Sequence, residues 1–355
     1  MDPKSCMLRG LELAARGRGH TATNPLVGAV IVKDDRIIAE GYHHFYGGDH
    51  AEVDALKNAA TEVHGATMFA TLEPCSHFGK TPPCARALID AGLRKVYVAM
   101  VDPNPKVAGQ GIAMLRNAGI EVEIGLCEAE ARELNRPYLK YIETGLPYVT
   151  IKIAQTLDGK IADFRGDSKW ITGQAARSRV HQLRSQVDAV LIGAGTARAD
   201  DPELTSHGVG ERDPKRLILS ATGNLPASLK LLTKALAEWT ILLTGETAGN
   251  GFPGQVWRLP SDIGGGLDLR AMLERVAVEK ICSILVEGGR KVFSALIDAG
   301  LVDKYIIVTA PKLVGGGLSG YDHPQERPLS ESLHLEIASV ERIDEDIWIE
   351  AYPKK

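Results

Sequence analysis

Apolar positions along residues 1–145 switch repeatedly between a helical and a strand period. Residues 7–15 carry apolar side chains at helical spacing, which predicts a helix. Two apolar runs, at 26–32 and 36–42, flank the turn-forming pair Asp34-Asp35, which predicts a β-hairpin. Helical and strand patterns then alternate. The further helices expected are 50–60, 82–91, 111–118 and 128–144, and the further strands are 66–72, 95–101 and 120–124.

This alternation predicts a layered α/β domain in which helices cover a sheet. The last helix contains Pro137, where it can restart, and Gly145-Leu146-Pro147 follows it. Because the α/β rhythm restarts after this segment, we expect two domains, residues 1–145 and 146–355. The strands expected in the second are 148–154, 189–192, 216–219, 240–243, 281–286 and 304–309, with helices at 174–185, 269–278 and 289–299 and an antiparallel pair at 335–343 and 347–352.

The composition is that of a soluble globular protein, with 355 residues, 44% of them hydrophobic and 24% charged. At roughly 150 residues per domain, this length also favours two domains. Forty-one Lys and Arg against 45 Asp and Glu give a net charge of -4, so we expect neither a nucleic-acid nor a membrane partner. No apolar stretch approaches the ~18 residues of a membrane span. The N-terminus lacks a signal pattern, so the expected compartment is the cytoplasm. A homo-oligomer is possible.

The five cysteines are sparse and odd in number, which is a poor disulfide framework. Two of them form a constellation with His50: the motifs are His50-Ala51-Glu52, Pro74-Cys75 and Cys84. Histidine and cysteine are favoured zinc ligands, and three protein ligands leave the fourth tetrahedral position for a water molecule, as in catalytic sites. Cys84 is expected at a helix N-terminus, which favours its thiolate. Glu52 points away from His50 on a helix, so we expect it to carry protons rather than to bind the metal.

A His-x-Glu motif followed by Pro-Cys and a second Cys is the signature of zinc nucleobase deaminases, in which the Glu is the general acid and base. Eight residues separate the two cysteines here, where the generic signature has two. Two other interpretations stay open. His50 and the cysteines can be ordinary core or loop residues, or His77 can supply a fourth ligand to a structural zinc ion.

The segment from Thr71 to Cys84, TLEPCSHFGKTPPC, closely resembles the bifunctional riboflavin-biosynthesis deaminase/reductase family, in which the long loop between the cysteines is a family feature. The resemblance covers nearly the whole chain, and four further motifs fit it: Asn24 to Val30, Gly41 to His43, Asp102 to Pro105 and Trp170 to Thr172. It implies an N-terminal cytidine-deaminase-like three-layer domain followed by a dihydrofolate-reductase-like α/β domain.

For the first domain, the resemblance implies zinc-dependent hydrolytic deamination of 2,5-diamino-6-(5-phosphoribosylamino)pyrimidin-4(3H)-one. His50, Cys75 and Cys84 match the Zn²⁺ ligands, and Glu52 matches the proton shuttle. The positions that line the substrate pocket match Asn24, His43, Ala51, Lys80, Asp102 and Asn104. From the residues alone, Asn24 and Asn104 also suit turns beside prolines, and Lys80 suits a solvated surface charge.

Two glycine motifs follow predicted strands in the second half. The run Gly193-Ala194-Gly195-Thr196 begins like a dinucleotide-binding fingerprint but lacks its third glycine and the acidic residue further on. In Glu287-Gly288-Gly289, two glycines join a strand to a helix, whose free N–H groups can bind a pyrophosphate beside Arg290 or Lys291. A bare Gly-Gly turn is the simpler interpretation.

For the second domain, the resemblance implies NADPH-dependent reduction of the ribosyl group to ribityl. The cofactor-contacting positions match Ala154, Trp170, Thr196, Asp200, Gly289, Arg290 and Lys291. The substrate-side positions match Lys152, Ser168, Arg184, Leu204 and Glu287, of which Lys152 is the catalytic candidate. From the residues alone, Trp170 also suits the core, and Arg184 suits a solvated helix face.

Two departures from the family pattern affect the second domain. Relatives carry an Arg where this chain has His207, so the cation expected to meet the ribose phosphate is an imidazole, which is only partly charged near neutral pH. Ser220-Ala221 stands where relatives tend to have Asp followed by Ser or Thr. The departures bear on phosphate affinity and on cofactor contacts.

These features favour a two-step enzyme of riboflavin synthesis that uses Zn²⁺ and NADPH and acts on a small phosphorylated pyrimidine. Two other classes are compatible with the motifs. A deaminase of another base, including tRNA, with an inert second domain predicts ammonia release from RNA. A zinc-stabilised, non-enzymatic binding module predicts that zinc removal unfolds the chain.

Overall fold

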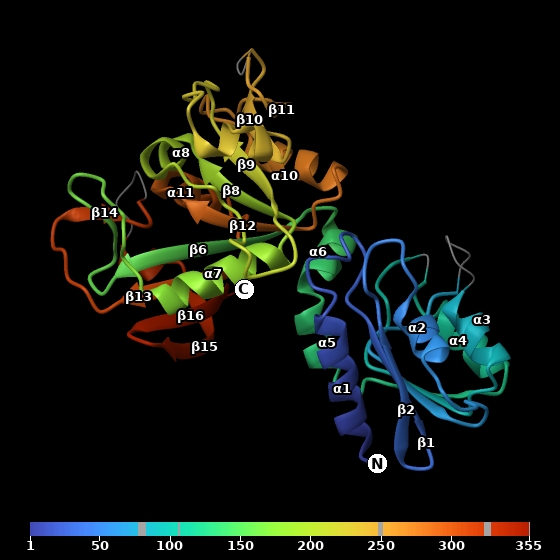
Figure 1. Ribbon diagram of the computed structural model, residues 1–355. Coiled ribbons are helices and arrows are strands. Elements are labelled where there is room, and N and C mark those ends of the chain that lie inside the picture. Colours follow the sequence, from blue (N-terminus) through green and yellow to red (C-terminus); the bar gives the residue numbers. More distant parts are fainter. Residues whose placement is uncertain (77–82, 106, 248–250, 323–327, 355) are drawn as a thin grey trace. The chain divides into compact units, whose positions relative to one another are not determined.

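The computed structural model describes residues 1–76, 83–105, 107–247, 251–322 and 328–354. The chain forms two compact units, unit 1 (residues 1–146) and unit 2 (residues 147–355), which Figure 1 shows as separate groups of helices and strands. Among the described residues, no helix is both long enough and apolar enough to cross a membrane.

Within its described residues, unit 1 is built on a five-stranded sheet with the order β2-β1-β3-β4-β5. β1 pairs antiparallel with both β2 and β3, whereas β3, β4 and β5 are parallel to one another. The expected hairpin is therefore confirmed as β1 and β2. The strands are β1 (Gly28–Lys33), β2 (Arg36–Tyr42), β3 (Thr67–Ala70), β4 (Lys95–Val98) and β5 (Glu121–Ile124).

Helices cover both faces of this sheet. Gly28 packs against α1 and Gly41 against α2, and an added Cβ would meet backbone atoms at 2.0 and 2.3 Å, so the close approach of each helix requires a glycine. These two positions face opposite sides of the hairpin, because Gly41 pairs with Ala29. The helices of unit 1 are α1 (Pro3–Ala15), α2 (Ala51–Lys57), α3 (Cys84–Asp90), α4 (Gln110–Asn117), α5 (Glu128–Leu134) and α6 (Arg136–Thr144).

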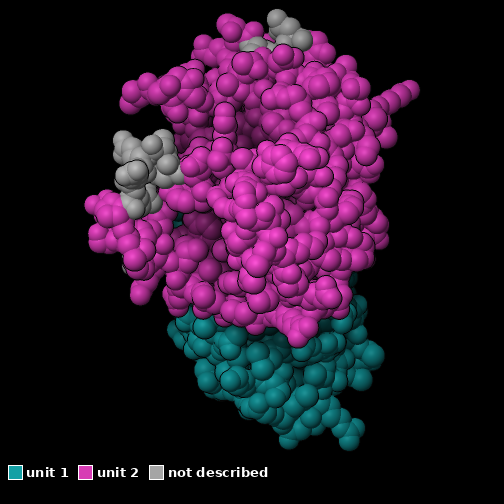
Figure 2. All heavy atoms as spheres, turned by 90° about the vertical axis from the view of Figure 1, so that its left-hand side faces the viewer, with its two compact units in different colours: residues 1–146 teal, residues 147–355 magenta. Residues whose placement is uncertain are grey.

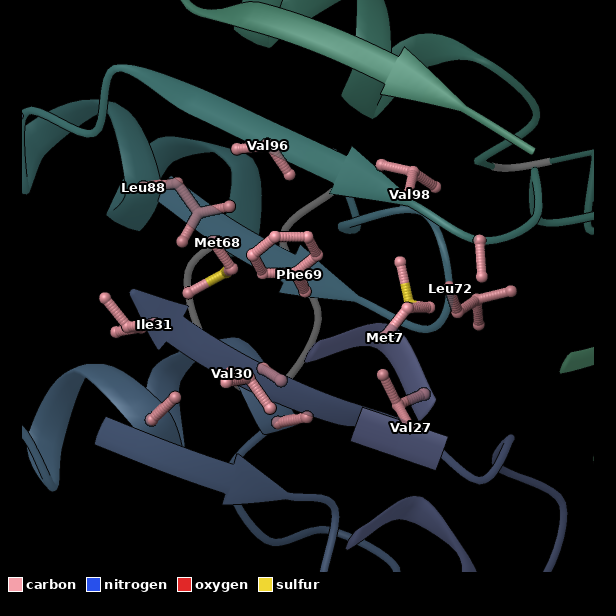
Figure 3. Packing of buried hydrophobic residues seen from close by; sticks show 14 of the residues in the cluster. Met7, Val27, Val30, Ile31, Met68, Phe69, Leu72, Leu88, Val96 and Val98 are labelled. Atoms are coloured by element: carbon pink, nitrogen blue, oxygen red, sulfur yellow. The ribbon is translucent and has the colours of Figure 1, made fainter. Parts of the chain in front are cut away.

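The core of unit 1 lies between the sheet and these helices. Figure 3 shows Ile31, Met68 and Leu88, from β1, β3 and α3, packed beside one another, and all three side chains are fully buried. Each buried aliphatic side chain of this size contributes about 1.5–3 kcal/mol of transfer free energy. The core fixes α3, which begins with Cys84, and β3, which ends at Ala70, five residues before Cys75.

Unit 2 holds a nine-stranded sheet, counted over its described residues, with the order β11-β10-β9-β8-β12-β6-β13-β16-β15. The strands from β11 to β13 run parallel, and β16 and β15 add an antiparallel pair, as expected for the C-terminal segments. The strands are β6 (Tyr148–Thr156), β8 (Ala189–Gly193), β9 (Lys215–Leu219), β10 (Thr240–Gly245), β11 (Gln255–Leu259), β12 (Ser283–Gly288), β13 (Lys304–Ala310), β15 (Leu335–Ile343) and β16 (Asp346–Pro353), with β7 (Lys160–Asp163) and β14 (Gly317–Ser319) as a separate pair.

Helices lie on both faces of this sheet as well. Leu183 of α7 packs with Val190 and Ile192 of β8, whereas Val292 of α11 approaches Gly193, whose position alternates to the other face. The helices are α7 (Gln174–Gln186), α8 (Ala194–Asp200), α9 (Lys234–Ala237), α10 (Leu269–Val278) and α11 (Arg290–Asp298), with 3-10 turns η1 (Lys230–Leu232) and η2 (Leu329–Glu331). In parallel sheets of this type, ligands bind outside the carboxyl ends of the strands.

Candidate active sites

The three residues of the zinc motif converge in unit 1. Their ligand atoms, on His50, Cys75 and Cys84, all lie within 4.8 Å of one another. Nδ1 of His50 is 3.2 Å from Sγ of Cys84 and 3.5 Å from Sγ of Cys75. A tetrahedral zinc ion with Zn–S of about 2.3 Å and Zn–N of about 2.0 Å places nitrogen and sulfur about 3.5 Å apart. The donor set and its spacing therefore fit zinc, and the interpretation as ordinary core residues is disfavoured.

The start of α3 acts on the sulfur of Cys75 rather than on that of Cys84. The backbone N–H of Cys84 donates to Sγ of Cys75 at 3.3 Å. The hydrogen bond with the Cys84 thiol lowers the pKa of Cys75 to about 4, and the same hydrogen bond, together with burial, raises the pKa of Cys84. Cys84 is the first residue of α3, as expected, and the first N–H of this helix points to the sulfur of Cys75, because the free N–H groups of a helix point toward the preceding loop.

Glu52 lies in the first turn of α2, and only 3% of it is exposed. Burial raises the pKa of Glu52 to about 7. A side-chain hydrogen bond links it to Cys84, although it does not belong to the ligand triad. A carboxyl group that titrates near neutrality is suited to both accept and donate a proton at pH 7.

His43 connects the loop of Asn24 to the turn before His50. Nδ1 of His43 donates to the carbonyl of Asp49 at 2.8 Å, because a carbonyl can only accept. Nε2 is then the acceptor for the Asn24 amide at 3.0 Å. Burial lowers the pKa of His43, which agrees with a neutral ring. The pair therefore fixes the Asn24 side chain beside the zinc triad.

Asp102 and Asn104 share one loop, which lies beside the segment that carries Cys75. The backbone N–H of Asn104 donates to Oδ1 of Asp102 at 2.9 Å. The carboxylate of Glu73 accepts backbone N–H groups of Asp102, Gly109 and others at the start of α4, which binds this loop to the Glu73-Pro74-Cys75 segment.

Three further predictions for unit 1 concern Ala51, Lys80 and His77. The methyl group of Ala51 is fully buried in the hydrophobic core, so a pocket contact by this residue would involve its backbone. Lys80, predicted to meet the substrate, and His77, the alternative fourth ligand, both lie outside the described residues.

Unit 2 contains a cavity of about 1860 Å³ at the carboxyl ends of β6, β8 and β12. Figure 2 shows the side of the unit on which its surface is hollowed. The cavity brings together every residue that the sequence predicted for the second domain: Lys152, Ala154, Ser168, Trp170, Arg184, Thr196, Asp200, Leu204, His207, Glu287, Gly289, Arg290 and Lys291.

A buried ion cluster forms the wall of this cavity. Glu287 accepts two hydrogen bonds from Arg184, at 2.6 and 3.1 Å, and lies 3.2 Å from Nζ of Lys152. Only 6% of the Glu287 side chain is exposed, and 12% of each of the two cationic side chains. Burial opposes ionisation of Glu287, but the charges of Arg184 and Lys152 outweigh it and lower the pKa of Glu287 to about 2. Arg184 is therefore not a solvated helix charge.

The two glycine motifs meet at one place in the cavity. An added Cβ on Gly288 or Gly289 would lie 2.9 or 2.7 Å from Oγ1 of Thr196, the third residue of α8. The Gly-Gly pair is therefore more than a bare turn, because it allows the backbone before α11 to lie directly against Thr196. Such a glycine-lined cradle between two helix starts suits the pyrophosphate of a dinucleotide such as NADPH.

Two predicted cofactor residues have surroundings that the sequence did not indicate. Trp170 is 65% exposed, which excludes the core interpretation, and the guanidinium of Arg177 lies 4.5 Å from the centre of its ring. Arg290 forms an ion pair with Asp322 at 2.9 Å, so its charge is already partly neutralised. Lys291 therefore stands as the stronger candidate for a pyrophosphate contact.

The loop that carries Leu204 and His207 has an uncommon backbone. Both residues adopt positive φ angles, 54° and 51°, and Asp201 has a φ of 41°. Non-glycine residues held in this region often mark functional sites. Leu204 is only 2% exposed and belongs to a hydrophobic core cluster with Val190 and Ile192, and it also lines the cavity.

His181 is a cavity residue that sequence reasoning missed. It lies on α7 three residues before Arg184, and its ring centre is 4.4 Å from that of His207. Burial and the charge of Arg184 lower the pKa of His181 to about 4. The i, i+3 spacing from Arg184 was the available signal, because such residues share one helix face.

Comparisons with known proteins match each of the two units to a protein family. Residues 2–100 match the family described as the cytidine and deoxycytidylate deaminase zinc-binding region, and residues 147–349 match the RibD C-terminal domain. The riboflavin biosynthesis protein RibD of Aquifex aeolicus is 42% identical over 347 residues, covering 98% of this chain and 97% of that protein. This chain belongs to the RibD family. The resemblance seen in the sequence is thereby confirmed.

Two solved RibD structures have the same fold as this chain over 99% of its length. One crystal form of Acinetobacter baumannii RibD has a TM-score of 0.90 at 39% identity, and 99% of each chain is covered. A diaminohydroxyphosphoribosylaminopyrimidine deaminase/5-amino-6-(5-phosphoribosylamino)uracil reductase from Thermotoga maritima gives the same values. The expected fold class is confirmed: a cytidine-deaminase-like domain followed by an α/β reductase domain.

Proposed function

We propose that the chain carries out two consecutive steps of riboflavin biosynthesis: deamination of a diaminopyrimidinone ribosylamine phosphate in unit 1, then reduction of its ribosyl group to ribityl in unit 2. The observation that carries the proposal is the presence in one chain of a His-Cys-Cys triad with a buried Glu52 and of a cavity that gathers the predicted reductase residues. Relatives with RibD names match over nearly the full length.

In unit 1, we assign the metal to His50, Cys75 and Cys84 and the proton transfers to Glu52. When bound, Zn²⁺ supplies Lewis-acid activation of a water molecule. Glu52 accepts protons from the attacking water and delivers one to ring nitrogen N1 and one to the amino group at C2, which leaves as ammonia. Oxygen replaces that nitrogen, so the product is the corresponding dione.

The substrate contacts of unit 1 are assigned to residues beside the triad. We propose that the Asn24 side chain, which is held by His43, and the loop of Asp102 and Asn104 contact the pyrimidine ring. Amide and carboxylate groups suit the hydrogen-bonding edge of such a ring. Lys80 is proposed for the ribose phosphate, because a phosphate needs a cation.

In unit 2, we assign the cofactor to the glycine cradle and its surroundings and the chemistry to Lys152. When bound, NADPH supplies a hydride to C1′ of the sugar. Opening the ribose ring adds a proton to the ring oxygen and leaves a C1′=N iminium that keeps its N–H, and the hydride then reduces this iminium to the amine. Lys152 is the cavity cation held by the buried Glu287, and we propose that its ammonium group provides the proton for ring opening. Ser168, Arg184, Leu204 and His207 are assigned to the substrate.

An inert second domain is disfavoured. Burying Glu287, Lys152 and Arg184 together costs desolvation energy that a plain hydrophobic core would avoid. Such a cluster at the wall of a cavity is typical of a functional site. The partner proposed for both units is a small phosphorylated pyrimidine, and a net charge of -4 argues against nucleic acid.

We expect the two activities to separate on division of the chain. The fragment 1–146 contains the triad and its own core, so it should bind zinc and release ammonia from the diaminopyrimidinone phosphate. The fragment 147–355 should bind NADPH and oxidise it only with the deaminated substrate. Ammonia and NADPH assays on each purified fragment test this. Activity that appears only in the full-length chain would show that the units depend on each other.

We expect the His207→Arg variant to bind the phosphorylated substrate with a flatter pH dependence. If His207 meets the ribose phosphate, its contribution needs a protonated ring, whereas an arginine side chain is always charged. KM of the reductase reaction should therefore rise between about pH 6 and 8 more steeply in the native chain than in the Arg variant. NADPH affinity should be similar in both. Parallel KM curves would assign the phosphate to Arg184 instead.

A further inference from the structure

The last helix of unit 1, α6, reaches one of the two predicted substrate loops through a buried tyrosine. Tyr138 is only 7% exposed, and its hydroxyl donates to Oδ1 of Asp102 at 2.8 Å. A side-chain hydrogen bond also links this hydroxyl to Asn104. Burial and the charge of Asp102 raise the pKa of Tyr138, so its hydroxyl keeps the proton that it donates. One side chain thus holds both polar residues of the Asp102–Asn104 loop.

The residue that precedes α6 holds the other loop. Oδ1 of Asn135 accepts from the backbone N–H of Leu26 at 2.8 Å, and Nδ2 donates to the carbonyl of the same residue at 3.0 Å. Asn135 is only 1% exposed. This two-point contact fixes the backbone two residues after Asn24, whose amide lies against His43.

The Asp102–Asn104 loop is therefore held from two sides. Glu73, two residues before Cys75, binds the backbone of Asp102 and Gly109. Tyr138 binds the side chains of Asp102 and Asn104. Glu73 holds the loop through its backbone N–H groups, whereas the Tyr138 hydroxyl contacts the side chains of Asp102 and Asn104 and so restrains their rotamers.

We propose that α6 is a positioning element of the deaminase site, in which Tyr138 orients Asp102 and Asn104 toward the substrate and Asn135 fixes the loop of Asn24. The site then extends beyond the zinc-binding region, whose match ends at residue 100. Tyr138 acts through other residues and does not itself react. This inference rests on the function proposed for unit 1.

The test is the Tyr138→Phe variant of the full-length chain, assayed for ammonia release from the diaminopyrimidinone phosphate. Loss of the buried hydrogen bonds to Asp102 and Asn104 should raise KM roughly 10-fold, with kcat within about 2-fold of the native value. Zinc content and the melting temperature should stay close to native. Reduction of deaminated substrate by unit 2 should be unchanged and serves as an internal control. Tyr97→Phe, which removes a hydroxyl from β4 in the same unit, should leave KM unchanged.

A second comparison separates positioning from general support of the fold. In an Asp102→Ala background, Tyr138→Phe should raise KM by less than it does in the native chain, because its main partner is already gone. Three results would each overturn the proposal. They are a KM increase for Tyr138→Phe that is as large in the Asp102→Ala background as in the native chain, an unchanged KM in Tyr138→Phe alone, and a loss of zinc in Tyr138→Phe. A native chain that releases no ammonia would instead contradict the function proposed for unit 1.

Discussion

Glu52→Gln should lower the rate of deamination by about 100-fold or more while zinc stays bound. The substitution keeps the size and polarity of the side chain but removes the group that accepts and releases protons, and general acid–base catalysis typically contributes 10²–10⁴-fold. His50, Cys75 and Cys84 are unchanged, so the metal content should remain at the native level. The measurement is ammonia release under saturating substrate, together with zinc analysis of the same sample.

Two controls make this experiment specific. Reduction of already deaminated substrate should be nearly unaffected, because Glu52 belongs to unit 1. Glu62→Gln makes the same chemical change at an exposed position of unit 1 and should leave ammonia release at the native rate. Near-native ammonia release from Glu52→Gln would remove this residue from the mechanism.

Glu287→Gln should both abolish most reductase activity and destabilise unit 2. The substitution leaves Lys152 and Arg184 buried without their counter-charge. Removing one partner of a buried ion pair typically costs about 3–5 kcal/mol of stability. Glu274→Gln is the matched control, because Glu274 pairs with Arg270 on the exposed face of α10 and exposed pairs contribute only about 0–1 kcal/mol. Urea unfolding followed by a probe of unit 2 gives both values.

The same residue predicts the direction of the pH dependence. The pKa of Glu287 is lowered from an ordinary 4.5 to about 2 in the folded chain. A group whose pKa is lowered by folding stabilises the fold fully at pH values above its pKa in the unfolded chain. This stabilisation is lost as the pH falls through the pKa of the folded chain. The stability difference between native chain and Glu287→Gln should therefore shrink as the pH falls from about 4.5 toward 2. A difference that is constant across this range would contradict a buried, ionised Glu287.

The local features of the fold could be predicted from the sequence. The hairpin of β1 and β2, the helix break before Pro137 and the antiparallel C-terminal strands all depend on short-range patterns of apolar and turn residues. The strands β7, β11 and β14 were missed. They are short, with three to five residues each, and none of them carries an apolar run long enough to distinguish it from a loop.

In the candidate sites, too, the sequence predicts some features and misses others. The zinc triad could be named because histidine and cysteine at this spacing have few other uses. The contacts that hold it could not, because Tyr138 reaches Asp102 across 36 positions and Asn135 reaches Leu26 across 109. The hydrogen bond from the N–H of Cys84 to the sulfur of Cys75 likewise depends on where the first N–H of α3 points, which no sequence pattern states.

The most direct measurement follows ammonia and NADPH together in one reaction of the purified full-length chain with the diaminopyrimidinone ribosylamine phosphate. One ammonia should appear for each NADPH consumed, with ammonia released first. Supplying deaminated substrate should bypass the first step, so that NADPH is consumed without ammonia, and this reaction should persist in Glu52→Gln. Ammonia without NADPH oxidation, from either this substrate or RNA, would contradict the assignment of two consecutive steps to this chain.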